Sequence, residues 1–182
     1  MWLTLPVGKK KYKGVAIDEV KIKDDAVFGE HGKTLKVMYS RAPFYDHEVC
    51  DLVSRGHESM AEHNTSLIQH ILQKLDMKPI VLHSSKLNIP IGNGTSGIID
   101  MVKALNGTEY ISGLGAKTYL EEKRFADESI ELRYASFEPL RYTQMHPGFV
   151  ENLSIIDAAF NISWKEVSQA LKNTKIVSSG EL

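Results

Sequence analysis

Residues 112–117 (SGLGAK) combine small, polar and basic side chains directly after a short apolar run. A strand that passes through a glycine turn into a helix aims backbone N–H groups at an anion or a carbonyl oxygen. Gly113 and Gly115 would let a ligand approach the backbone, while Ser112 adds a hydroxyl and Lys117 a charge. The motif is neither GxGxxG nor a Walker loop, so a tight turn alone explains the glycines equally well.

A second polar segment is Asn152–Asp157 (NLSIID). Ser154 suits a helix N-cap, and Asp157 three positions later suits the acid of a capping box. In that role alone, Asp157→Asn should cost well under about 1 kcal/mol of stability. Capping is the simpler explanation, but it leaves Asn152 without a role. We therefore also predict Asp157 as an acid/base or orienting carboxylate, with Asn152 and Ser154 as hydrogen-bond donors to substrate.

A third candidate is Asn64, which shares the apolar stripe of a strongly amphipathic helix predicted from about Glu58 to Leu75. We expect Asn64 to face inward among aliphatic residues. A buried amide must find hydrogen-bond partners or be costly, so Asn64 either ties down a neighbouring loop or faces a substrate cavity.

The metal-binding residue types show no ligand spacing. The seven histidines are scattered, and we predict that His63 and His70 lie on the polar side of their helix. Cys50, the single cysteine, lacks a nucleophile context and is predicted to be a partly buried structural thiol. We therefore predict no tightly bound metal and assign no cofactor.

The elements that must position these residues alternate between helix and strand. Helices are predicted over Lys33–Ser40, Phe44–Val53, Glu58–Leu75, Ile98–Leu105, Tyr119–Phe125 and Ser154–Asn161. Strands are predicted over Met1–Val7, Ala16–Ile22, Pro79–Leu82, Glu109–Ser112 and Ile130–Phe137. The alternation predicts an α/β fold with a mostly parallel, layered sheet and helices on both faces. Pro79–Leu82 and Glu109–Ser112 should be neighbouring interior strands of it.

Composition and charge favour a single globular domain over residues 1–182. We divide it into N-terminal strands or a hairpin (1–30), an α/β core (31–161) and a C-terminal helix and tail (162–182). The formal net charge is −1, and the one basic run, Lys9–Lys13, fits a solvated hairpin edge, so we expect no nucleic-acid partner. The sequence shows no transmembrane run and no signal peptide, so we expect a cytoplasmic protein.

An ordered set of short motifs makes the chain resemble the WbqC-like family. The motifs are Trp2–Val7 (WLTLPV), Tyr39–Tyr45 (YSRAPFY), Ser84-Ser85, Tyr110–Gly113 (YISG) with Gly115, Lys117, Tyr119 and Leu120, and Asn152–Asp157 followed by Phe160-Asn161. Members of this family lie in bacterial O-antigen and other surface-polysaccharide gene clusters, and a glycine (aminoacyl) transferase role has been proposed for them. The resemblance implies a transferase that acts on a small-molecule or glycan substrate.

The resemblance departs from the family at its start. Family members typically carry a His-Gln-Pro-x-Phe/Tyr segment upstream of the part that resembles Trp2, and this chain has none. From that departure we expect an exposed sheet edge, which invites self-association. It also keeps two alternatives open: a non-catalytic ligand-binding remnant of the family, and a nucleotidyltransferase-like enzyme, for which no nucleotide-binding loop is evident.

The two polar segments should meet in space. Ligand sites of open α/β sheets form beyond the carboxyl ends of the strands, where the turn at Ser112–Lys117 begins. A helix that starts near Ser154 would bring its N-terminal N–H groups to the same place. We therefore predict that the turn and Asn152–Asp157 line one concavity.

Overall fold

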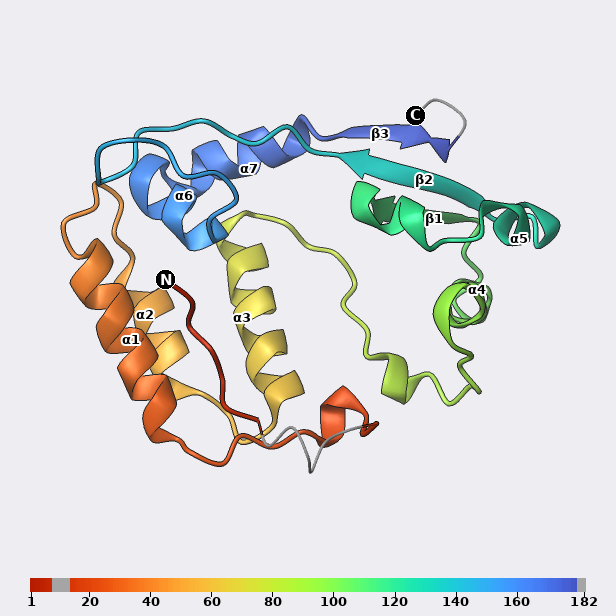
Figure 1. Cartoon of the computed structure of the whole chain (residues 1–182), viewed down its shortest axis with the longest axis horizontal. Coiled ribbons are helices and arrows are strands. Elements are labelled where there is room, and N and C mark those ends of the chain that lie inside the picture. The colour runs from red at the N-terminus through yellow and green to blue at the C-terminus, as the bar shows by residue number, and fades with distance from the viewer. Residues whose placement is uncertain (8–13, 180–182) are drawn as a thin grey trace. The chain divides into compact units, whose positions relative to one another are not determined.

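The computed structural model describes residues 1–7 and 14–179 (Figure 1). The helices are α1 (Ala26–Tyr39), α2 (His47–Arg55), α3 (Met60–Lys74), α4 (Gly94–Ala104), α5 (Glu122–Asp127), α6 (Ile155–Ile162) and α7 (Trp164–Lys172). The 3-10 helices are η1 (Ile17–Glu19), η2 (Ser84–Lys86) and η3 (Leu114–Thr118), and the strands are β1 (Glu109–Gly113), β2 (Glu131–Ser136) and β3 (Lys175–Ser178). The chain forms two compact units: unit 1 is Met1–Pro79 with Leu140–Gln169, and unit 2 is Ile80–Pro139 with Ala170–Leu182.

Unit 1 is helical, and its core begins with the packing of α1 on α2. Gly32 is buried on α1, where an added Cβ would overlap the side chain of Ser54 on α2. Small residues at such a crossing let two helix backbones approach closely. Phe28 and Phe160 are fully buried, so α1 and α6 both contribute aromatic rings to the core of this unit.

Helix α3 buries a different face from the one predicted. Ser59 caps it by accepting a hydrogen bond from the Glu62 backbone N–H at 3.3 Å. His63 is only 3% exposed, and its ring lies 4.7 Å from that of Phe28, whereas Asn64 is exposed. The predictions of a surface His63 and an inward Asn64 are therefore wrong. Packing against the Phe28 ring fixes the rotation of the helix, and hydrophobic periodicity alone locates a face only to about one residue.

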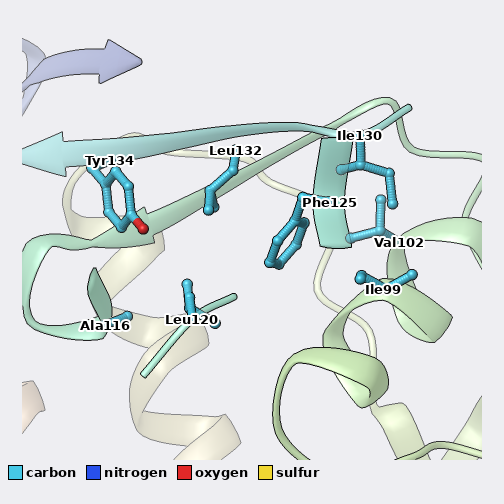
Figure 2. Close-up of a cluster of buried hydrophobic side chains, with 8 residues drawn as sticks. All are labelled: Ile99, Val102, Ala116, Leu120, Phe125, Ile130, Leu132 and Tyr134. Atoms are coloured by element: carbon cyan, nitrogen blue, oxygen red, sulfur yellow. The ribbon is translucent and has the colours of Figure 1, made fainter. Parts of the chain in front are cut away.

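Unit 2 contains a three-stranded sheet in the order β1-β2-β3. Strands β1 and β2 are parallel, with Ser112 opposite Tyr134, and β2 and β3 are antiparallel, with Tyr134 opposite Val177. One face of the sheet packs on α4, η3 and α5 (Figure 2). The buried cluster comprises Ile99, Val102, Ala116, Leu120, Phe125, Ile130, Leu132 and Tyr134.

The α/β composition is confirmed, but the sheet of the described residues is mixed instead of mostly parallel. Pro79–Leu82, predicted as an interior strand, is irregular and exposed, and so is not the neighbour of β1. An apolar run of four residues becomes a strand only where a partner satisfies its backbone, which periodicity does not reveal. Met1–Val7 is also irregular, and Trp2 is 93% exposed.

The remaining differences lie near the ends of the chain. Ala16–Ile22 contains η1 and then forms one isolated bridge, from Lys21 to Ser59, instead of a full strand. Strand β3 was not predicted. The basic run Lys9–Lys13 lies outside the described residues. Across the part of the chain that the structure describes, no helix has the length and apolar character needed to cross a membrane.

Candidate functional site

The carboxylate of Asp157 is the centre of a buried polar cluster in unit 1. Asp157 is 5% exposed. Tyr39 donates its hydroxyl proton to Oδ1 at 2.8 Å, and Tyr142 donates to Oδ2 at 2.6 Å. The side-chain amide of Gln144 donates to Oδ2 at 3.3 Å. A buried carboxylate is costly unless donors surround it, and these three side chains supply them.

The N-terminus of α6 positions this carboxylate. Ser154 is the N-cap, and its hydroxyl accepts from the Ile156 N–H at 3.3 Å. The N–H of Asp157 donates to the Ser154 carbonyl at 2.9 Å. The carboxylate of Asp157 does not return to Ser154 as a capping box requires, because it accepts from Tyr39, Tyr142 and Gln144. The cap is therefore confirmed and the reciprocal half of the box is not.

Tyr39 is the last residue of α1, and its side chain extends to Asp157. Its ring packs edge-on against Phe160, with 5.6 Å between centroids, and Tyr45 packs on the same ring at 5.4 Å. The Phe44 N–H donates to the Phe160 carbonyl at 2.9 Å, which joins the turn after α1 to α6. The segment Tyr39–Tyr45 thus holds one donor of the cluster in place.

The two phenols are neutral donors at ordinary pH. Burial and then donation to Asp157 raise the pKa of Tyr142 to about 12. The same two causes, in the same order, raise the pKa of Tyr39. A phenol that donates to a carboxylate keeps lone pairs that can accept a proton from a third group. The arrangement can therefore pass a proton from a bound hydroxyl or amine, through a phenol, to Asp157.

The turn after β1 belongs to unit 2. Ser112 is buried, and Gly113, Gly115 and Lys117 are exposed. The turn leads into the five-residue η3 and not into an α-helix, so no long helix dipole serves it. An added Cβ at Gly113 or Gly115 would meet no heavy atom within 4 Å, and neither glycine has a positive φ. Steric need therefore does not explain these glycines, which weakens the argument that they serve only a tight turn.

Comparison with known proteins gives a family. The WbqC-like protein family matches this chain over residues 1–169. The chain belongs to the WbqC-like protein family. It is also 26% identical over 167 residues to the uncharacterized protein Rv1507c of Mycobacterium tuberculosis (strain ATCC 25618 / H37Rv), an alignment that covers 88% of this chain and 71% of that protein. No solved structure matches.

The other predicted site residues of this WbqC-like protein fall into both units. Asn152 is exposed and has a φ of 58°, a left-handed conformation that asparagine tolerates well, so the turn before α6 gives it a structural role. Ser154 is also exposed and acts as the cap described above. Asn64 lies on α3, and its role in binding substrate stays a prediction. The shared concavity of Ser112–Lys117 with Asn152–Asp157 is also still a prediction.

Sequence reasoning missed Tyr142 and Gln144. These two residues stand two apart in a segment without helix or strand, and both donate to Oδ2 of Asp157. The available signal was a Tyr-Thr-Gln run between a strand and the Pro147-Gly148 turn. Tyr39 had appeared among the motifs of the family resemblance but without a role.

A GxGxxG motif at Gly92–Gly97 was also missed, and packing explains it. A Cβ on Gly97 would overlap the Gly92 carbonyl, and Gly94 has a φ of 56°. The Gly92 N–H already donates to the Asp100 carboxylate at 2.9 Å, so a side chain of the protein takes the place of an anion. Irregular chain precedes the motif, where a dinucleotide-binding fold would need a strand.

Among the described residues, no group of three or more His, Cys, Asp or Glu side chains is arranged to hold a metal ion. The nearest histidines are His57 and His63, whose ring centroids lie 6.4 Å apart in unit 1. Cys50 is a free thiol that is buried more fully than the partial burial predicted, and burial raises its pKa, which makes it a poor nucleophile.

Proposed function

We propose that this WbqC-like protein is a transferase of bacterial surface-polysaccharide (O-antigen) biosynthesis that moves an acyl group, such as glycyl, from an activated donor to a sugar. The observation that carries the proposal is the buried carboxylate of Asp157, which two neutral tyrosine hydroxyls hold in place. Acyl transfer needs a group that takes a proton from the attacking hydroxyl or amine. Membership of the WbqC-like family supports the substrate class.

The proposed step runs through Tyr39. The acceptor oxygen attacks the carbonyl carbon of the donor, its proton passes to the Tyr39 oxygen, and Tyr39 passes its own proton to Oδ1 of Asp157. A carbon–oxygen bond forms, and the bond to the leaving group breaks with its electron pair on that group. The proton then returns from Asp157 through Tyr39 to the leaving group. Oδ1 suits this role because Tyr39 is its one donor among the described residues, while Oδ2 already has two.

For unit 2, we propose that the turn after β1 binds substrate through Ser112, Gly113 and Gly115. Lys117 is proposed to offset negative charge that develops on the donor. The support is the absence of a steric reason for either glycine. Asn152, Ser154 and Asn64 are proposed as further substrate contacts of unit 1, each to be tested by its own variant.

The experiment has two stages. A thermal-shift screen across nucleotide sugars, nucleotides and glycine identifies a ligand, and mass spectrometry of the acceptor sugar then detects transfer from an activated glycyl donor. Tyr39→Phe removes one hydroxyl and should abolish transfer while binding is kept. Tyr119→Phe is the matched control, because Tyr119 is 66% exposed and lies in unit 2. Transfer at the wild-type rate by Tyr39→Phe would refute the proposed role of Tyr39.

A second candidate function is a ligand-binding protein without catalysis. One observation favours it: both oxygens of Asp157 already have donors from the protein itself, as a structural carboxylate would. It predicts a thermal shift with a sugar ligand, no transfer, and unchanged binding in Tyr39→Phe. A nucleotidyltransferase would instead be stabilised by ATP or CTP. The Gly92–Gly97 loop gives no support to that alternative, because its Gly92 N–H already donates to the Asp100 carboxylate and irregular chain precedes the loop.

A further inference from the structure

The side-chain amide of Gln144 is fixed in a single orientation. The Val150 N–H donates to Oε1 of Gln144 at 2.9 Å, and Nε2 of Gln144 donates to the Val150 carbonyl at 2.9 Å. A flipped amide would place N–H against N–H and oxygen against oxygen, so the flip is excluded. The second hydrogen on Nε2 therefore always points towards Oδ2 of Asp157, at 3.3 Å.

This amide closes a loop of seven residues, from Gln144 to Val150, which we call the Gln144 loop. It has no helix or strand, and Gly148 in it has a φ of 90°. Phe149 in the loop packs edge-on against Tyr142 at 5.7 Å, and the Arg141 guanidinium lies 5.5 Å from the Phe149 ring centroid. The loop thus rests on Tyr142, the other donor to Oδ2.

The bond from Gln144 to Asp157 is the longest of the three at the carboxylate, at 3.3 Å against 2.6 and 2.8 Å. Hydrogen bonds to an ionised carboxylate are roughly twice as strong as those between neutral groups. When Asp157 gains a proton, the longest and weakest of these bonds is the first to be lost. The amide of Gln144 would then keep only Val150 as a partner.

We propose that Gln144 is a positioning residue that couples the Gln144 loop to the charge on Asp157. While Asp157 is ionised, Gln144 and Tyr142 hold Oδ2 and the loop together. When Oδ1 takes up a proton, the bond to Gln144 weakens and the loop loosens. Proton uptake at Oδ1 during catalysis rests on the proposed function. The coupling between the charge on Asp157 and the Gln144 loop does not.

The test needs no substrate, so it is independent of the reaction. The Val150 amide proton reports on the loop through hydrogen exchange, because its partner is Gln144. Gln144→Met keeps the length of the side chain and removes both polar atoms. Gln69→Met, on the exposed surface of α3, is the matched control. Gln144→Met should speed exchange at Val150 at least about tenfold, given the loss of both hydrogen bonds between Gln144 and Val150, and Gln69→Met should not.

Asp157→Asn removes the charge. It should speed hydrogen exchange of the Val150 amide several-fold more than it speeds exchange of the Leu35 amide in α1. Leu35 is buried in unit 1 and corrects for global unfolding. In the double variant, exchange at Val150 should be no faster than in Gln144→Met alone. Exchange in Asp157→Asn that rises no more at Val150 than at Leu35 would overturn the coupling.

A measurement on the wild-type chain covers the case in which Asp157→Asn does not fold. Both Nε2 protons of Gln144 have acceptors, one in Val150 and one in Asp157. Both should therefore exchange slowly with water at neutral pH. Fast exchange at neutral pH of the proton that faces Asp157 would contradict the proposal.

Discussion

The two polar segments that stand out in the sequence behave in opposite ways. In unit 1, Asp157 is buried, and among the described residues its side-chain donors are Tyr39, Tyr142 and Gln144. In unit 2, the turn at Ser112–Lys117 presents glycines with open space where a side chain would be. One segment is dense with internal contacts, and the other has a backbone that nothing in unit 2 crowds. A hydrogen-bonded network resists change, whereas an uncrowded turn leaves room for a ligand.

The largest expected effect is at Asp157. Asp157→Asn removes a charged acceptor of three hydrogen bonds in a buried position, and should lower the free energy of unfolding by about 2–4 kcal/mol. This exceeds the cost expected from a capping role alone, since the carboxylate serves two tyrosines and a glutamine. Chemical denaturation measures it. Asp18→Asn, at an exposed site in the same unit, should stay within about 0.5 kcal/mol. A similar small loss in Asp157→Asn would show that the network contributes little.

Two glycines of α1 test how tightly unit 1 is packed. A Cβ at Gly32 would overlap Ser54 and lie 3.1 Å from the Cys50 carbonyl, so Gly32→Ala should cost about 1–3 kcal/mol. Gly29→Ala, on the same helix, meets open space and should stabilise by roughly 0.5–1 kcal/mol. Equal melting temperatures for the two variants would show that α1 and α2 can separate without cost.

Unit 1 should also respond to pH through His63. Burial, together with His57 and with His31 on α1, lowers the pKa of His63 below that of an unfolded chain. The unfolded chain then binds more protons, so stability is complete above about pH 6.5 and is lost as pH falls towards the lowered value. Melting temperature measured from pH 7.5 to 5.5 should fall in the wild type and fall less in His63→Leu. His146→Gln, at an exposed site, should show the same dependence of melting temperature on pH as the wild type. If His63→Leu also shows the wild-type dependence, His63 is not the group responsible.

The smallest effect on stability is expected in unit 2. Gly113 has an ordinary φ of −76°, and alanine fits both glycine positions of the turn. The double variant Gly113→Ala with Gly115→Ala should therefore keep the free energy of unfolding within about 1 kcal/mol of the wild type. If the turn approaches a ligand, the same variant should abolish the thermal shift from that ligand. A large loss of stability would show that these glycines are needed for the fold of the turn and not for a ligand.

Local patterns predicted most of the regular elements. α2, α3, α4, α6, β1 and β2 lie at or within a few residues of their predicted positions, because amphipathic spacing and caps such as Ser154 are local in sequence. Short apolar runs were predicted less well where no neighbouring cap or turn residue distinguishes a strand from irregular chain. Pro79–Leu82 and Met1–Val7 look like strands, yet strand formation depends on a partner that the run itself does not specify.

The sequence by itself determined the family, the polar segment at Asn152–Asp157 and the helix that begins after Ser154. Only the tertiary structure decided what Asp157 contacts, since Tyr39 lies 118 positions away and Tyr142 15 positions away. It also decided that α3 buries His63 and not Asn64. Helix caps and periodicity follow from neighbours within a turn or two, whereas the partners of a buried carboxylate depend on which distant segments pack together.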